Sequence, residues 1–245
     1  MIQSYFQPRR VVVVGAGGSI GAAFVSQLVE QAGVEVVYAL SRQEQSFESH
    51  KVQPQTVDIH DESSLAHVAD VIGEQGAIDT VIVAVGMLHD EDTRPEKSLK
   101  ELSADSFNKL FAVNTIAPAL IAKHFVPLLP RKEPSVWAAL SARVGSISDN
   151  RLGGWYAYRM SKAALNMFVK TMSIEVGRSR RHAAVVGLHP GTVDSGLSKP
   201  FQARVPEGKL FSPEYSVSQL LKVISGLQPE DSGTIFAWDG QAIEY

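Results

Sequence analysis

A tyrosine and a lysine stand four residues apart in the strongly helical segment Tyr158-Arg159-Met160-Ser161-Lys162. Side chains at positions i and i+4 of a helix lie on one face, so Tyr158 and Lys162 can share a site. A lysine cation beside a phenol stabilises the phenolate and lowers its pKa from the usual value of about 10 toward the range useful for proton transfer. The pair predicts a general acid/base at Tyr158, and an ordinary Tyr/Lys pair on a helix surface is the alternative.

A second motif, near the N-terminus, is suited to binding phosphate. Four valines at 11–14 run directly into Gly15-Ala16-Gly17-Gly18-Ser19-Ile20-Gly21, and a helical pattern follows at 22–29. A continuous β-branched run is typical of a buried parallel strand. The glycines would let the backbone approach a pyrophosphate at the positive end of the next helix. This order of strand, turn and helix predicts a dinucleotide site, although glycines that only make a tight turn would look similar.

Together, the two motifs resemble the short-chain dehydrogenase/reductase family over a stretch from about residue 11 to residue 237. Tyr158 and Lys162 match the tyrosine and lysine of this family, and Asn114 matches its helix asparagine, which lies at a bulge or kink. The resemblance implies hydride transfer between a nicotinamide cofactor and a carbonyl or alcohol carbon, while the protein supplies geometry and a proton. It also implies that Lys162 holds the ribose hydroxyls and that Asn114 anchors a water that relays protons to Lys162.

The resemblance assigns further cofactor contacts to residues that follow the predicted strands. They are Gly15, Gly17, Gly18, Ser19, Ile20 and Gly21 after the first strand, Ser41 and Arg42 after the second, Asp58 and Ile59 after the third, Ala84, Val85 and Gly86 after the fourth, and Pro190, Gly191, Val193 and Ser195 after the sixth. Ser19 replaces the middle glycine of the family, but serine is small and can itself donate to phosphate. Of the family's asparagine-asparagine-alanine-glycine turn after the fourth strand, only Gly86 remains.

The choice of cofactor depends on the residues after the second strand, which read Leu40-Ser41-Arg42. A carboxylate there would bond the ribose 2′-OH, whereas a cation accommodates a 2′-phosphate. No acidic residue is present at this position, and Arg42 can form a planar, charge-assisted fork to phosphate. We therefore predict a preference for NADP(H). NAD(H) remains possible if Arg42 is only a solvent-facing turn residue.

The clearest departure from the family is a missing serine. Alignment of the segment 140–145 with the family's serine-serine-x-x-glycine stretch puts Ala142 where the substrate-orienting serine usually stands. Ser141 is one residue away on a strand, so its side chain should point to the opposite face. Ser146, just past Gly145, is our candidate for the role. The alternative is a loop serine that bonds local backbone.

Within the family, the segment 145–159 and the loop 189–194 resemble the branch that contains the C-factor-type cell–cell signalling proteins and the carbonyl reductase sniffer. The main prediction is thus an NADP(H)-dependent oxidoreductase that interconverts a small-molecule carbonyl and an alcohol, with Tyr158 as general acid/base. A cofactor-binding signalling or sensor protein with little turnover is the competing hypothesis, because Ala142 lacks the usual hydroxyl. A third hypothesis, a pure interaction module, would require that no cofactor binds.

Strands and helices alternate along the chain, a pattern that demands a parallel sheet with helices on both faces. The predicted fold class is α/β, a Rossmann-type doubly wound parallel sheet of about seven strands, in a single domain at 1–245. Strands are predicted at 11–14, 34–40, 55–58 (the end of the third), 78–85, 135–141, 183–188 and 234–238, and helices at 22–29, 62–71, 104–129, 155–176 and 213–226. The helices at 104–129 and 155–176 carry more apolar side chains than one sheet face can cover. Because these two helices pair across a two-fold axis in the family, we expect a homodimer or homotetramer.

Composition agrees with one soluble protein of the cytoplasm. The 245 residues are 44% hydrophobic, which suffices for a substantial core. The formal charge of -3 and the lack of any Lys/Arg-rich run favour neither a nucleic-acid nor a membrane partner, and the apolar runs are too short to span a bilayer. With no cysteine there is no disulfide and no thiolate metal site. The seven histidines show no paired metal-ligand spacing, so no metal is expected.

Overall fold

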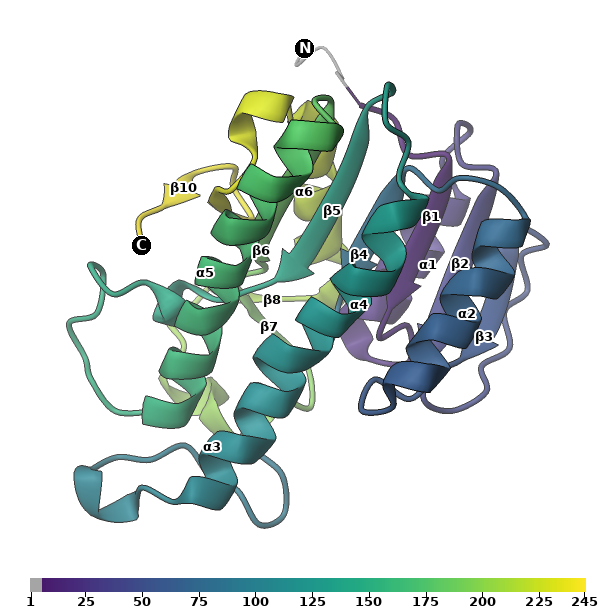
Figure 1. Ribbon diagram of the computed structural model, residues 1–245. Coiled ribbons are helices and arrows are strands. Elements are labelled where there is room, and N and C mark those ends of the chain that lie inside the picture. Colours follow the sequence, from purple (N-terminus) through teal and green to yellow (C-terminus); the bar gives the residue numbers. More distant parts are fainter. Residues whose placement is uncertain (1–5) are drawn as a thin grey trace.

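A mostly parallel sheet forms the middle of the molecule (Figure 1). In the computed structural model, which describes residues 6–245, eight strands pair in the order β10-β9-β6-β5-β4-β1-β2-β3. They are β1 (Arg10–Val14), β2 (Val36–Ser41), β3 (Val52–Thr56), β4 (Thr80–Val83), β5 (Ser135–Leu140), β6 (Ala183–His189), β9 (Ile235–Ala237) and β10 (Ala242–Ile243). All neighbours are parallel except β9 and β10. The Rossmann-type prediction is confirmed, with β10 as an extra two-residue strand that is too short to leave a sequence pattern.

The buried strands follow from their residue types. β1 contains four consecutive valines and is covered on both sides, as is β5, because helices pack on both faces of the sheet. β3 lies at the sheet edge, is partly exposed and includes Pro54, a residue that edge strands tolerate because it has no N–H to donate. The end of the third strand, predicted at 55–58, falls at Thr56, since residues 57 and 58 already leave the sheet.

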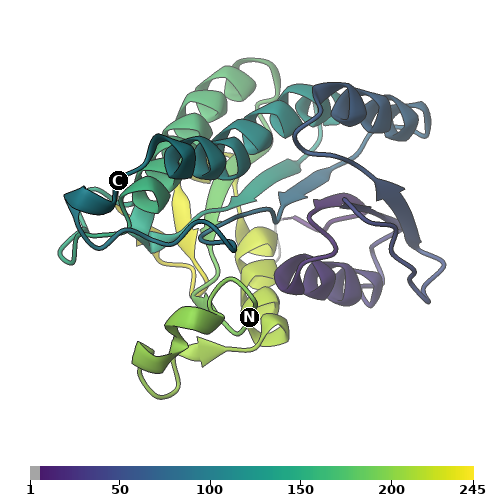
Figure 2. The same cartoon turned by 90° about the horizontal axis from the view of Figure 1, so that it is seen from below.

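Helices cover the two faces of the sheet as separate layers (Figure 2). The helices are α1 (Ser19–Val29), α2 (Glu62–Glu74), α3 (Ala104–Phe111), α4 (Ala117–Phe125), α5 (Tyr156–Ser179) and α6 (Pro213–Gly226). On one face, α2, α4 and α5 share a core with Trp137, while α1 and α6 share a core around Phe24 on the other. The small two-stranded sheet of β7 (Thr192–Val193) and β8 (Leu210–Phe211) lies outside the main sheet.

The long helix predicted at 104–129 is interrupted. After α3, the residues Ala112–Ile116 form a π-helical turn, η2, before α4 continues the same axis. Single π-helical turns widen a helix locally and occur often at functional sites. Asn114 lies in this turn, so the bulge that the family resemblance implied is present at the residue it implied.

The stretch Ala104–Leu128 is long and apolar enough to cross a membrane by length and composition, and the described residues contain one such helix. Polar residues such as Asn114 interrupt this stretch, so it is not one continuous apolar run, and a buried core helix can have the same length and composition. Here Ile121 and Phe125 of this stretch pack against the sheet with no exposed surface.

The chain reverses the direction of its crossovers at the centre of the sheet. β1 lies between β2 and β4, and the connections run outward from it on both sides. In such sheets, ligands bind in the crevice at the carboxyl ends of the strands, at this switch point. The turns after β1 and β4 meet there, since the Ala84 N–H donates to the carbonyl of Val14.

Candidate active site

The turn between β1 and α1 has no room for side chains at two of its glycines. A Cβ on Gly21 would lie 2.0 Å from the carbonyl oxygen of Gly15, and a Cβ on Gly15 would lie 2.8 Å from that of Ala84. Gly15 also has a φ of +93°, a conformation that favours glycine. Gly18 precedes α1, and no side chain caps this helix end. Unpaired N–H groups at the start of α1 therefore remain available for an anion, which is the cradle that a pyrophosphate requires.

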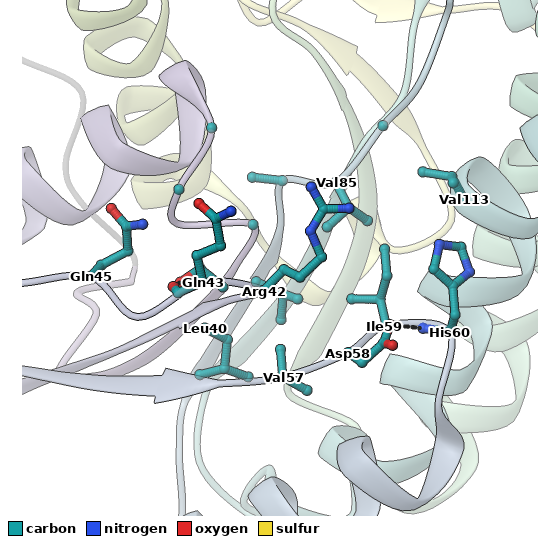
Figure 3. Close-up of a pocket in the computed structure, with 17 residues that line it drawn as sticks. Leu40, Arg42, Gln43, Gln45, Val57, Asp58, Ile59, His60, Val85 and Val113 are labelled. Carbon is teal, nitrogen blue, oxygen red and sulfur yellow. Dashed lines mark hydrogen bonds between the residues drawn. The ribbon is translucent and has the colours of Figure 1, made fainter. Parts of the chain in front are cut away.

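On one side of this turn lies a cavity of about 410 Å³ (Figure 3). Its lining includes ten of the predicted cofactor residues, namely Gly15, Gly17, Gly18, Ser41, Arg42, Asp58, Ile59, Ala84, Val85 and Gly86. Sequence reasoning missed Gln43, Gln45, His60 and Val113, which also line it. Gln43, Gln45 and His60 follow strand ends, and Val113 lies in the π-helical turn between α3 and α4, in segments without a recognisable motif, so only their position in the fold reveals them.

Arg42 is the cation of this cavity. Its side chain is exposed and forms no hydrogen bond or ion pair with any described residue. In Figure 3 the guanidinium extends across the pocket toward Val85. Ser41 is buried, and its hydroxyl donates to the carbonyl of Gln43 at 2.6 Å. The nearest predicted carboxylate, Asp58, accepts a bond from the His60 N–H at 2.9 Å. A ligand phosphate would thus meet an uncommitted guanidinium at the end of β2.

A second cavity, of about 550 Å³, adjoins the first. The two share Gly17, Gly18, Ala84, Val85 and Gly86, so the glycine turn separates two parts of one groove. The other predicted residues in the second lining are Ser19, Ile20, Tyr158, Lys162, Pro190, Gly191, Val193 and Ser195. Gly21 lines neither cavity. Its part is to let α1 pack against the turn, as the 2.0 Å distance to Gly15 shows.

Tyr158 and Lys162 lie side by side on α5 and are almost completely buried. The Lys162 Nζ donates to the carbonyl of Leu140 at 2.8 Å and lies 6.0 Å from the centre of the Tyr158 ring. Burial raises the pKa of Tyr158 to about 12 and lowers the pKa of Lys162 to about 7. The prediction that Lys162 lowers the pKa of the phenol is therefore wrong in direction for this structure, because desolvation by burial raises that pKa.

Asn114 lies directly behind this pair and is completely buried. Its Oδ1 accepts from the Met87 N–H at 2.8 Å, and its Nδ2 donates to the Met87 carbonyl at 2.8 Å and to the Ser161 hydroxyl at 3.0 Å. A side chain at Gly86 would lie 3.6 Å from both Asn114 Oδ1 and Lys162 Nζ. Asn114 thus ties the turn after β4 to α5. Because protein groups occupy its amide, a water relay through that amide finds no support in these contacts.

The serine position differs from the family as the sequence indicates. Ala142 lines the second cavity, and the Ser141 hydroxyl donates to Asn166 Oδ1 on α5 at 2.6 Å. Ser146 is buried outside the cavity lining, and its oxygen accepts from the Asp149 N–H at 3.1 Å. These contacts favour the alternative of a loop serine that bonds local backbone, because the hydroxyl is already used within its own loop.

The loop after β6 closes the far end of the cavity. Gly191 has a φ of +77°, and a Cβ there would lie 2.6 Å from the ring of Phe211. Glycine is thus required by both conformation and space. The carbonyl of Val193 accepts from the Ser198 hydroxyl, which leaves less of the Val193 backbone for a carboxamide than the resemblance implied. Ser195 lines the cavity.

Aromatic side chains form one wall of the second cavity. The rings of Trp155 and Phe201 lie 5.0 Å apart, and Trp155 lies 6.3 Å from the Tyr158 ring. His89 stands 5.6 Å from Phe201 and bonds the carbonyl of Leu197 through Nε2. Sequence reasoning did not place Trp155 in the site. A tryptophan after two glycines gives no local signal of what it will contact.

A family model described as short chain dehydrogenase matches residues 9–205. The match covers most of the chain, including the glycine turn, Asn114, Tyr158 and Lys162. The protein therefore belongs to the short-chain dehydrogenase family, and the predictions of family membership and of an oxidoreductase are confirmed.

Individual relatives agree with this placement. The 1-hydroxy-2-glutathionyl-2-methyl-3-butene dehydrogenase of Rhodococcus sp. (strain AD45) is 30% identical over 96% of this chain and 99% of that protein. The C-signal protein of Myxococcus xanthus is 36% identical over 56% of this chain and 77% of its own. Among solved structures, the carbonyl reductase sniffer of D. melanogaster has a TM-score of 0.86, with 19% identity over 98% of this chain and 100% of the other. The resemblance to the C-factor and sniffer branch is confirmed by these matches.

Proposed function

We propose that this protein is an NADP(H)-dependent oxidoreductase that interconverts a carbonyl and an alcohol by hydride transfer, with Tyr158 as the general acid/base. The observation that carries the proposal is the position of Tyr158. Its phenol lines a cavity that continues into the glycine turn, and Lys162 and Asn114 are fixed behind it. A proton donor therefore adjoins the place where a nicotinamide would lie.

The protonated form of Tyr158 is the form that acts as an acid in carbonyl reduction. With a pKa of about 12, the phenol is protonated at neutral pH and can donate its proton to a carbonyl oxygen that gains negative charge. Bound NADPH would supply the hydride to the carbonyl carbon. Trp155 and Phe201 line the same cavity, and their rings would cover one side of the reacting oxygen. The oxidation of alcohols needs the phenolate, so a lower pKa would be required for that direction.

Arg42 supports the choice of NADP(H). The end of β2 carries an exposed, unpaired guanidinium and no carboxylate. Arginine binds phosphate through two parallel N–H bonds, whereas a ribose 2′-OH offers it no negative charge. We expect NADPH to bind at least tenfold more tightly than NADH, equivalent to about 1.4 kcal/mol.

A direct test uses the purified chain with NADPH and a panel of aldehydes, ketones and diketones. Calorimetry first measures whether NADPH binds, and single-turnover oxidation of the bound cofactor then reports the chemistry. Rapid oxidation with at least one carbonyl compound is the expected result. Tight binding without oxidation across the panel would instead support a sensor or signalling protein. This is the competing hypothesis, which is based on the absent hydroxyl at Ala142 and on the similarity to the C-signal protein.

We also propose that the protein forms a homodimer through α5. Three apolar side chains recur every seven residues on this helix, namely Met160, Met167 and Ile174, and each is at least half exposed. Ile116, at the end of the π-helical turn η2, is also about half exposed. Side chains spaced by seven residues lie on one helix face. Light scattering at micromolar concentration should give at least a dimer, and Met167→Lys should weaken it. A monomeric wild type would contradict this assembly.

The cytoplasm is the place of action that we propose. NADPH turnover requires the intracellular cofactor pool, and a chain without cysteine gains nothing from an oxidising compartment. Fractionation of cells that express the tagged chain should recover it with cytosolic markers. Recovery with membranes or medium would contradict the proposal.

A further inference from the structure

The start of α5 has an unusual backbone. Gly153 and Gly154 have φ angles of +63° and +66°, and Trp155, the residue before the helix, has a φ of +53°. This left-handed conformation is costly for a bulky side chain and persists only where surrounding contacts impose it. No side chain of α5 or of the preceding loop caps the helix N-terminus. Since Tyr158 is the third residue of the helix, whatever fixes this start also fixes the catalytic phenol.

Glu96 provides the missing contacts from a distant part of the chain. It lies in the segment between β4 and α3 and is only 2% exposed. Its main-chain carbonyl accepts from the Trp155 N–H at 2.6 Å, and its Oε2 accepts from the Ala157 N–H at 3.3 Å. Among the described residues, Glu96 alone bonds first-turn N–H groups of α5 from outside the helix and its leading loop.

The carboxylate of Glu96 is an acceptor that suits the N-terminal end of α5, which it contacts. N–H groups at a helix start are unpaired and positive, and a carboxylate is the group that best satisfies them. The Glu96 Oε1 is buried and has no hydrogen-bond partner in the described part of the chain. A buried polar atom without a partner costs free energy of folding, so an apolar side chain would be more stable than glutamate here if the side chain only filled space. The residue therefore has a task that an apolar side chain would not perform.

Arg159 completes the arrangement from the other side. Its guanidinium donates to the carbonyls of Gly153, Gly154 and Val144. These bonds hold the glycine loop next to Val144, which lines the second cavity. Arg159 belongs to α5 itself and so fixes the loop relative to the helix. Glu96 instead fixes both relative to the segment that follows β4, which also carries the turn that adjoins the cofactor groove.

We propose that Glu96 is a positioning residue for the reaction. By bonding the N–H groups of Trp155 and Ala157, it holds the left-handed Trp155 against the cavity and sets the position of the Tyr158 hydroxyl relative to the cofactor groove. The expected effect on kcat rests on the proposed reductase function, whereas the role of Glu96 in fixing the start of α5 does not. A displacement of about 1 Å at a reacting group can cost about a hundredfold in rate, so the loss of the side-chain bond to the Ala157 N–H should appear mainly in kcat. The main-chain bond to the Trp155 N–H remains whichever side chain stands at position 96.

Two substitutions separate the hydrogen bond from the volume that Glu96 fills. Glu96→Gln keeps an oxygen that accepts from the Ala157 N–H, and Glu96→Met keeps a similar volume without an acceptor. We expect Glu96→Met to lower kcat at least tenfold while the NADPH dissociation constant changes less than threefold. Glu96→Gln should keep kcat within about threefold of wild type. The matched control is Glu101→Met, because Glu101 is exposed and, among the described residues, bonds only the Lys97 N–H and the Ser98 hydroxyl within its own turn.

Amide hydrogen exchange tests the same inference without any substrate. The Ala157 amide, measured by NMR, should exchange faster in folded Glu96→Met and at the wild-type rate in Glu96→Gln. If wild type turns over no carbonyl compound, the proposed function fails while this exchange result still decides the role of Glu96. An unchanged kcat and exchange rate in Glu96→Met would overturn the inference. Should Glu96→Met not fold, a loss of more than tenfold in kcat of folded Glu96→Gln would overturn it as well.

Discussion

The two parts of the groove differ in how their functional groups are held. On the side of Arg42, the cation is exposed and has no partner, and His60 beside it is exposed too. On the side of Tyr158, the phenol, Lys162 and Asn114 are between 0% and 8% exposed and are tied to neighbouring elements. Exposed charges are screened by water and salt, whereas buried groups act at fixed geometry in a low dielectric. Changes on the reaction side should therefore have much larger effects than changes on the Arg42 side.

The largest effect is expected for Tyr158→Phe. The change removes the proton donor and keeps the ring that packs against Trp155, so kcat for carbonyl reduction should fall by at least about a thousandfold, the range that general acid catalysis spans. The NADPH dissociation constant, measured by calorimetry, should stay within about threefold of wild type. Retained turnover in Tyr158→Phe would show that another group supplies the proton.

Lys162→Met should abolish most activity and alter the dependence of stability on pH. The pKa of Lys162 is lowered to about 7, so the unfolded chain binds one more proton than the folded chain between pH 7 and the ordinary lysine value. The contribution of Lys162 to the free energy of unfolding is therefore most favourable above the pKa that lysine has in the unfolded chain, and it is lost as the pH falls toward 7. The free energy of unfolding of Lys162→Met, relative to that of wild type, should therefore rise by on the order of a few kcal/mol as the pH falls from 10 to 7, as measured by urea unfolding. A difference that does not vary with pH would contradict the lowered pKa.

On the other side of the groove, Arg42→Ala should produce a smaller change. We expect NADPH affinity to fall about tenfold and NADH affinity to remain nearly constant, which removes a preference of about 1.4 kcal/mol. Calorimetry at two salt concentrations would show whether the preference weakens with salt, as expected for an exposed cation. Arg94→Ala, an exposed arginine outside both cavities, is the control. Equal affinities for NADPH and NADH in wild type would refute the assignment.

The smallest effect is expected where the family serine is absent. Ala142→Ser places a hydroxyl in the lining of the second cavity and should leave kcat unchanged or raise it up to about tenfold, less than the roughly hundredfold or more that a fully aligned donor contributes at a developing oxyanion. Ser146→Ala should leave kcat within about twofold in either background, because its oxygen serves the Asp149 N–H. A large loss in Ser146→Ala would restore Ser146 as the substrate-orienting group.

Features set by local sequence were predictable, and features set by distant contacts were not. The glycine turn and the i, i+4 pair Tyr158 and Lys162 depend on neighbouring residues alone, so their spacing revealed them. The contact between Glu96 and Ala157 joins residues 61 positions apart and leaves no pattern in either segment. The same holds for the contact of Trp155 with Phe201. The directions of the pKa shifts at Tyr158 and Lys162 depend on burial, which spacing does not give.

The central claim is that hydride passes from NADPH to a carbonyl carbon beside Tyr158. The most direct measurement uses NADPH with deuterium at both C4 positions of the nicotinamide, in a single turnover with a carbonyl compound from the panel, and mass spectrometry of the product. The account predicts an alcohol that carries one deuterium, formed at least about a thousandfold more slowly by Tyr158→Phe. An undeuterated product, no product despite saturating NADPH, or equal rates in both proteins would contradict it.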